Sequence, residues 1–169
     1  MEKPIFKFAI REDLKQLSNY RDFLPSKAEP FATGWDVRAA QLSHEGLVIK
    51  PGDYVKIPLG FRAIPPPGWW FEIHPRSSSF FKKNLHVLVG IIDETYPDEV
   101  SLLVNYIPSS TKMCKDLTIQ FGERLGQMMP VHRVDMEIND MSNEDFDSFI
   151  KNRGAERTGG IGSTDQKGI

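Results

Sequence analysis

The stretch HPRSSSF, residues 74–80, combines residue types that could bind a phosphate. Arg76 offers a planar fork of donors that suits phosphate oxygens. Ser77 and Ser78 add hydroxyls and, in a turn after the expected strand 69–74, successive backbone N–H groups that can form an anion-binding nest. Alone, this stretch is more typical of a polar loop in which Arg76 pairs with a surface carboxylate.

The stretch GIIDETY, residues 90–96, could bring a carboxylate and an aromatic ring together. Asp93 follows an apolar strand, which should bring it to the edge of a buried region, and a carboxylate there can orient or deprotonate a water. Three residues on, Tyr96 can offer its ring face to a sugar or a base. As an isolated pattern, this is more typical of a turn begun by aspartate at the end of a hairpin.

The run RTGGIGST, residues 157–164, could also meet a phosphate. Its glycines would let backbone N–H groups come close to a ligand, and its Ser and Thr add hydroxyls. The run is not a P-loop, because no strand leads in and no Gly-Lys-Ser/Thr opens a helix behind it. A glycine-rich terminus is by itself typically an inert tail, so a functional interpretation requires a phosphate site elsewhere.

Short β-strands must position these stretches, because period-2 alternation and β-branched or aromatic residues dominate the sequence. Turn signals separate the apolar runs at 50–53, 65–68 and 107–112. This spacing predicts an all-β fold of antiparallel strands, a barrel or a sandwich, rather than alternating βαβ units. The expected strands cover residues 3–10, 35–39, 47–50, 54–64, 69–74, 85–92, 99–106, 117–121 and 126–138.

Two segments break the strand pattern. Residues 11–23 are compatible with a short helix. Residues 142–151 predict one short helix, because Ser142 or Asn143 can cap it and its apolar side chains recur at helical spacing. After this helix the chain becomes glycine-rich and loses periodicity, so residues 153–169 are expected to be flexible.

Composition excludes several classes of protein. The chain has 169 residues, which predicts a single domain, and its net charge of −2 gives no basic field for nucleic acid. The single cysteine, Cys114, excludes an intramolecular disulfide, and no Cys/His spacing suggests zinc. No signal peptide and no membrane-spanning run is evident, so we expect a cytoplasmic protein, or one inside a host cell if the origin is viral.

In order along the chain, five stretches resemble the motifs of the trimeric dUTP diphosphatase (dUTPase) family. Each motif is weak alone, but five in the correct order with suitable spacing make a strong signal. The similar stretches are LPSKAEPFATGWDVRA (24–39), PRSSS (75–79), GIIDETY (90–96), GERLGQMMP (122–130) and ERTGGIGST (156–164).

The resemblance implies jelly-roll-like (β-clip) subunits in a homotrimer, with three active sites shared between chains. Residues 1–152 would form the β domain, and residues 153–169 an arm that closes over the nucleotide. The implied reaction is hydrolysis of dUTP to dUMP and pyrophosphate. Mg²⁺ would be coordinated by the triphosphate, with no protein side chain bound to it directly.

The resemblance also implies a role for each matching residue. Asp93 would orient the water for in-line attack on the α-phosphorus, and Asp36 would act through water on the metal or on a neighbouring Arg. Tyr96 would stack under the deoxyribose. The uracil would be read by backbone groups of a hairpin around residues 85–92, with Gly90 and Ile92. The phosphates would be held by Arg76, Ser77, Ser78 and Gln127 and, from the arm, by Arg157, Gly162, Ser163 and Thr164.

Three departures from the family pattern concern the nucleoside. Ile161 stands where the arm usually carries an aromatic residue over the uracil, so stacking is lost unless Phe146 or Phe149 replaces it. Leu88 stands where an extra glycine is frequent, and its side chain could narrow the base pocket. The usual Tyr-x-Gly-Glu becomes YPDE at 96–99, which alters the turn after the tyrosine.

Three alternatives stay open. The arginine of the arm could be Arg153, although closeness to the glycine pair favours Arg157. A dCTP deaminase or a bifunctional enzyme of the same fold needs a glutamate as general base, and the corresponding run SLLVN (101–105) is apolar, which argues against deamination. A non-catalytic regulator that binds nucleotide or protein would have no use for a water-orienting carboxylate at Asp93.

Overall fold

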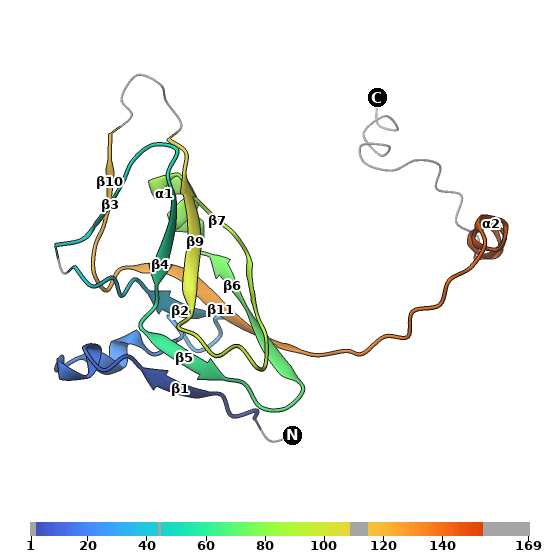
Figure 1. Ribbon diagram of the computed structural model, residues 1–169, viewed down its shortest axis with the longest axis horizontal. Helices are drawn as coiled ribbons and strands as arrows, with labels where there is room; N and C mark the ends of the chain where they lie inside the picture. The colour runs from blue at the N-terminus through green and yellow to red at the C-terminus, as the bar shows by residue number, and fades with distance from the viewer. Residues whose placement is uncertain (1–2, 44, 109–114, 154–169) are drawn as a thin grey trace. The chain divides into compact units, whose positions relative to one another are not determined.

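The computed structural model describes residues 3–43, 45–108 and 115–153. The chain divides into two compact units, Met1–Val134 and Asp135–Ile169. The strands lie in the first unit, and helix α2 (Asn143–Asn152) lies in the second (Figure 1). No helix in the described ranges is long and apolar enough to cross a membrane.

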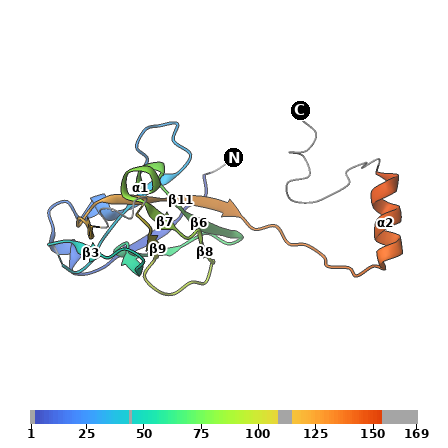
Figure 2. The same ribbon diagram turned by 90° about the horizontal axis from the view of Figure 1, so that it is seen from above.

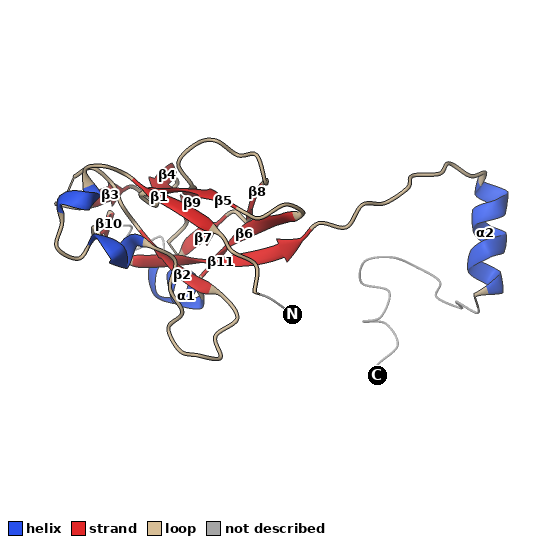
Figure 3. Cartoon of the chain, turned by 90° about the horizontal axis from the view of Figure 1, so that it is seen from below, coloured by secondary structure: helices blue, strands red, loops and turns tan. Residues whose placement is uncertain are grey.

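Strands dominate the first unit, as Figure 3 shows. Its elements, with η for a 3₁₀ helix, are β1 (Lys7–Ile10), η1 (Leu14–Gln16), η2 (Tyr20–Phe23), β2 (Trp35–Arg38), β3 (Leu47–Ile49), β4 (Tyr54–Pro58), β5 (Phe61–Ile64), β6 (Trp69–Pro75), α1 (Ser77–Lys83), β7 (Leu85–Val87), β8 (Gly90–Ile92), β9 (Ser101–Tyr106), β10 (Leu117–Ile119) and β11 (Arg124–His132).

All described strand pairs are antiparallel and form four small sheets, in the orders β1-β5, β10-β3, β2-β11-β6-β8 and β4-β9-β7. Each sheet turns one face to a common apolar core. The side chains at the centre of this core include Phe61, Phe71, Ile49, Ile57 and Leu102. The prediction of an all-β, jelly-roll-like fold of antiparallel strands is therefore confirmed.

Two of the expected strands are each interrupted. The run 54–64 forms β4 and β5, because Gly60 between them turns the backbone at a φ of 78°. A Cβ atom on Gly60 would lie 2.3 Å from a methyl carbon of Leu14, so the turn also needs the missing side chain. The run 85–92 forms β7 and β8, which pair with β9 and β6 respectively. The expected hairpin of paired strands at 85–92 is therefore wrong.

Helix α1 replaces the turn that was expected after Arg76. Its first turn is tied to β11, because the backbone N–H of Arg76 and the buried hydroxyl of Ser79 both donate to the carbonyl of Leu125, at 3.2 Å and 2.7 Å. Asn84, with a φ of 53°, ends the helix in the left-handed conformation. The helix packs against β7 and β11 (Figure 2).

The two segments that broke the strand pattern are helical. Residues 11–23 hold the short 3₁₀ helices η1 and η2 rather than one helix. The helix expected at 142–151 is confirmed as α2, and Ser142 caps it by accepting a hydrogen bond from the backbone N–H of Asp145 at 3.1 Å.

Candidate active site

The outer face of the sheet β2-β11-β6-β8 carries polar residues from three strands. Residues directly opposite in antiparallel strands point to the same face of the sheet. Gln127 of β11 lies between Asp36 of β2 and His74 of β6, so these three side chains form a row across three strands. The other face of β6 places Phe71 and Ile73 in the core.

Asp36 is buried at one end of this row, between two guanidinium groups. One carboxylate oxygen, Oδ1, lies 3.2 Å from Nε of Arg76, and the other, Oδ2, lies 3.6 Å from an Nη1 nitrogen of Arg124. Oδ2 is buried and has no hydrogen-bond partner among the described residues. Gln127 donates from Nε2 to the carbonyl of Pro75 at 3.1 Å. We call Asp36, Arg76, Arg124 and Gln127 the Asp36 cluster.

Ser77 and Ser78 lie beside the Asp36 cluster, in the first turn of α1. Ser77 is exposed and Ser78 is half-buried. The N–H groups of a first helical turn have no partner within the helix, so both residues can present a backbone donor as well as a hydroxyl. The structure thus brings Arg76, the two serines and Gln127 together around Asp36.

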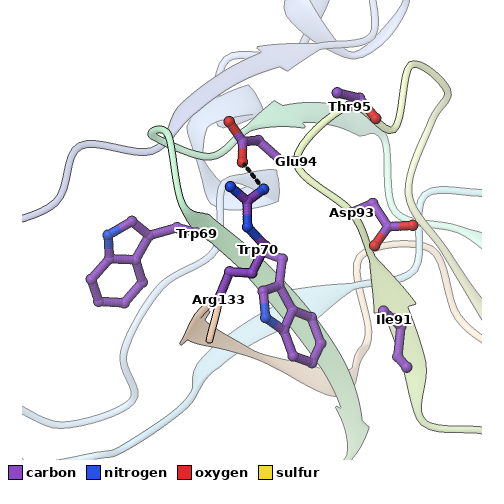
Figure 4. A pocket seen from close by; sticks show the side chains of 7 residues that line it. All are labelled: Trp69, Trp70, Ile91, Asp93, Glu94, Thr95 and Arg133. Atoms are coloured by element: carbon purple, nitrogen blue, oxygen red, sulfur yellow. Dashed lines mark hydrogen bonds and ion pairs between the residues drawn. The ribbon is translucent and has the colours of Figure 1, made fainter. Parts of the chain in front are cut away.

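Asp93 lies elsewhere, at the rim of a cavity of about 560 Å³ (Figure 4). Its carboxylate is exposed, and the backbone N–H of Tyr96 donates to its carbonyl at 3.1 Å to close a turn. The cavity offers two indole rings, carboxylates and a guanidinium, and its lining consists of Trp69, Trp70, Ile91, Asp93, Glu94, Thr95 and Arg133.

The Asp36 cluster and Asp93 occupy opposite corners of the sheet. Asp93 follows Ile92, which pairs with Phe71, so it stands beside Trp70, four residues along β6 from His74. Three strand spacings across the sheet and four residues along it separate Asp36 from Asp93 by about 20 Å. One chain therefore does not bring these two groups into a single cavity.

The nucleoside positions are distributed around β8. Tyr96 is half-buried and packs against the main core, and Leu88 is exposed between β7 and β8. At Gly90 an added Cβ would lie 3.9 Å from that of Ile73, an ordinary contact. Space around β8 therefore does not by itself require a glycine at position 90.

The arm residues that the sequence singled out, Arg157, Ile161, Gly162, Ser163 and Thr164, lie outside the described residues. The aromatic residues that could replace the missing ring, Phe146 and Phe149, lie on α2 and are both about half exposed. The ring of Phe149 is covered by the guanidinium of Arg153, whose carbon lies 4.4 Å from the ring centre.

Sequence reasoning missed three residues that the structure places at these corners. Arg124 reaches Asp36 because β11 pairs with β2, which is a contact between residues far apart in the sequence. Trp70 and Glu94 line the cavity beside Asp93. Alternation along β6 could have predicted that Trp70 lies on the same face as His74, but nothing local indicated the partners of Glu94.

The comparison with known proteins assigns the chain to a family. The dUTPase family model matches residues 23–164. The chain is 36% identical over 128 residues to the deoxyuridine 5'-triphosphate nucleotidohydrolase of Aquifex aeolicus, covering 73% of this chain and 81% of the relative. It is 34% identical over 163 residues to the protein of the same name from Bdellovibrio bacteriovorus, covering 94% of this chain and 97% of the relative.

The fold is similar as well. A crystal structure of a dUTPase from Streptococcus mutans superimposes with a TM-score of 0.64 at 21% identity, and the match covers 78% of this chain and 98% of that one. With the family model matching most of the chain and relatives above 30% identity, the chain belongs to the dUTPase family.

Proposed function

We propose that the chain hydrolyses dUTP to dUMP and pyrophosphate by in-line attack of water on the α-phosphorus. The observation that carries the proposal is the family match over residues 23–164, a span that includes all five motifs. The matched relatives bear the name deoxyuridine 5'-triphosphate nucleotidohydrolase. The two corners of the sheet would supply the groups that this reaction needs.

The Asp36 cluster would bind the triphosphate. Asp36 engages Arg76 through Nε, and Nη1 of Arg76 donates to the carbonyl of Arg124 at 3.5 Å, which leaves Nη2 and the second hydrogen of Nη1 to meet phosphate oxygens. The first turn of α1 adds the donors of Ser77 and Ser78, and Gln127 keeps a second amide hydrogen besides the one given to Pro75. Little covalent chemistry is required of the protein, because phosphoryl transfer depends mainly on positioning and on charge neutralisation.

Mg²⁺ fits this corner as an ion carried by the substrate. The described residues hold no group of three or more His, Cys, Asp or Glu side chains that could cage a metal. The buried Oδ2 of Asp36 has no hydrogen-bond partner there, so it can accept from a water of the ion's hydration shell. When bound, Mg²⁺ would neutralise part of the triphosphate charge.

Asp93 would orient the attacking water from its exposed position on the cavity rim. Tyr96, close by in the same loop, would support the deoxyribose. Backbone groups of β8, from Gly90 to Ile92, would read the uracil even though β8 does not pair with β7. An unpaired buried polar group costs about 1–3 kcal/mol, which is enough to discriminate uracil from cytosine.

A homotrimer with shared sites would resolve the separation of the two corners. Within one chain, strand geometry places the corner with Asp93 about 20 Å from the corner with Arg76. A site that uses both residues would therefore take Asp93 from one chain and Arg76 from a neighbouring chain. Residues 153–169 would complete the site as an arm, with Arg157, Gly162, Ser163 and Thr164 on the phosphates and Ile161 over the base.

Pyrophosphate release from dUTP, dCTP, dTTP and UTP with Mg²⁺ tests the activity, with Asp93→Asn as the matched control. We expect release from dUTP alone and a loss of about 10²–10⁴-fold in the control, the usual contribution of a positioned acid or base. Ammonia release from dCTP would instead identify a deaminase. Tight binding of dUTP without any release would identify a regulator.

Site sharing can be tested separately with two inactive variants. Asp93→Asn and Arg76→Ala, co-expressed and assembled at random, should regain about one quarter of the wild-type activity if each site takes the two residues from different chains of a symmetric trimer. Each variant alone should stay inactive. No recovery in mixed trimers would show that both residues of a site come from one chain.

A further inference from the structure

The loop that carries Asp93 is attached to the rest of the fold through a neighbouring side chain, Glu94. The loop leaves β8 after Ile92 and returns to the core at Tyr96, which packs against the main cluster. Between these points Asp93 and Thr95 are exposed. The side chain of Glu94 is only 30% exposed and points toward Arg133 (Figure 4).

A single oxygen of Glu94, Oε2, accepts two hydrogen bonds. One comes from the backbone N–H of Gly68 at 3.1 Å, in the turn before β6. The other comes from the guanidinium of Arg133 at 3.1 Å, just after β11. The side chain of Glu94 therefore joins the loop that carries Asp93 to two segments at once.

These two segments are themselves tied together, so that the attachment is rigid. The backbone N–H of Arg133 donates to the carbonyl of Gly68 at 2.8 Å, which closes a ring of hydrogen bonds through Glu94. The N–H of Trp69 donates to the carbonyl of Pro66 at 3.0 Å, and Trp69 packs edge-on against His132 at 5.1 Å between ring centres. Glu94 thus connects to a well-braced corner rather than to a free loop.

Stability alone does not explain this arrangement. The Arg133 side chain is 56% exposed, and an ion pair so open to solvent contributes little to folding. The position of the Asp93 carboxylate can matter far more for the reaction rate, because displacing a catalytic group by about 1 Å can lower the rate about 10²-fold. Asp93 is exposed and adjacent in sequence, so the Glu94 contacts set where its carboxylate stands on the cavity rim.

We propose that Glu94 is a positioning residue, which holds the loop bearing Asp93 through its contacts with Gly68 and Arg133. The inference rests on the proposed hydrolysis of dUTP and adds to it a residue that does not touch the substrate. It assigns importance to the reach of the side chain rather than to its charge. A glutamine of the same length can still accept from both donors, whereas an aspartate keeps the charge and withdraws the oxygen from both.

Glu94→Asp and Glu94→Gln separate the effect of side-chain length from the effect of side-chain charge. In steady-state pyrophosphate release, Glu94→Asp and Glu94→Ala should each lower kcat by about 10–100-fold, the range expected for a misplaced catalytic group, with KM for dUTP changed less than about threefold. Glu94→Gln should keep kcat within about threefold of the wild type, because its oxygen stays in place. Glu12→Ala, which removes an exposed carboxylate paired with Lys15, is the matched surface control and should change neither constant.

The outcomes are distinct. An active wild type with kcat of Glu94→Asp within twofold overturns the inference and leaves the proposed function intact. A larger loss in Glu94→Gln than in Glu94→Asp also overturns it, since charge would then matter more than reach. A folded wild-type trimer that releases no pyrophosphate refutes the proposed function itself. If Glu94→Ala does not fold, the comparison of the aspartate and glutamine variants still decides.

Discussion

Replacing Asp36 by asparagine tests whether this carboxylate holds Arg76 in place or holds the fold together. The carboxylate is buried between Arg76 and Arg124, but its contacts are long, at 3.2 Å and 3.6 Å. The two guanidinium side chains are 31% and 39% exposed, so they can recover hydration when the carboxylate is lost. Breaking a fully buried ion pair costs about 3–5 kcal/mol, and this one should cost less.

We therefore expect Asp36→Asn to lower the free energy of unfolding by about 1–2 kcal/mol. For a chain of this size that corresponds to a fall in Tm of about 3–7 °C. The backbone pairing of Asp36 with Ser26, at 2.7 Å and 3.1 Å, does not involve the side chain and should survive. The larger effect should be on the rate, with kcat/KM for dUTP lowered about 10–100-fold because Arg76 loses its anchor.

Thermal unfolding followed by circular dichroism and steady-state pyrophosphate release measure the two effects on the same preparation. Asp53→Asn is the matched control, since Asp53 is exposed and its side chain accepts from the backbone N–H of Lys50 at 2.9 Å, which an asparagine can also do. A kcat/KM within twofold of the wild type would refute the anchoring role of Asp36. A fall in Tm far above 7 °C would show that the ion contacts are structural.

Three further substitutions test the packing and the surface electrostatics. Gly60→Ala should lower the free energy of unfolding by about 2–4 kcal/mol in urea, from left-handed strain plus the clash with Leu14. Gly52 has a φ of 88°, and an added Cβ there would meet nothing within 4 Å. Gly52→Ala should therefore lower the free energy of unfolding only by the left-handed strain, about 1–2 kcal/mol, and equal losses in the two variants would contradict the steric argument. The side-chain hydrogen bond from Arg11 lowers the pKa of Asp13 below its ordinary 3.8, so its stabilisation is present above that pH and disappears as pH falls through the lowered value. Asp13→Asn should thus lower Tm slightly at neutral pH, with a gap to the wild type that closes in acid; a gap independent of pH would refute the assignment.

Local pattern was sufficient for most of the strands and for one helix, but not for the interruptions within the runs 54–64 and 85–92. Phe71 and Ile73 alternate with Glu72 and His74 along β6, and this alternation predicted the strand over residues 69–74. Ser142 and the apolar spacing behind it predicted α2 to within one residue at each end. Both signals are carried by neighbours in sequence, because the period of a strand or helix is a local property.

Helix α1 shows where local pattern is insufficient. The run SSSFFKK contains three serines and no strong apolar stripe, so a turn was the natural expectation. The helix is held by hydrogen bonds from Arg76 and Ser79 to Leu125, a residue 46 positions beyond Ser79. Such a contact exists only after β11 has paired with β6.

The sequence by itself determined the residue types of the site and their order along the chain, since these residues belong to five motifs that follow one another in the family's order. Only the tertiary structure decided their placement. It put Arg124 beside Asp36, gave Glu94 its two donors, and separated Asp36 from Asp93 by the width of a four-stranded sheet. The physical reason is that strand pairing brings together residues dozens of positions apart, and the period of a strand specifies which face a side chain takes but not which strand lies next to it.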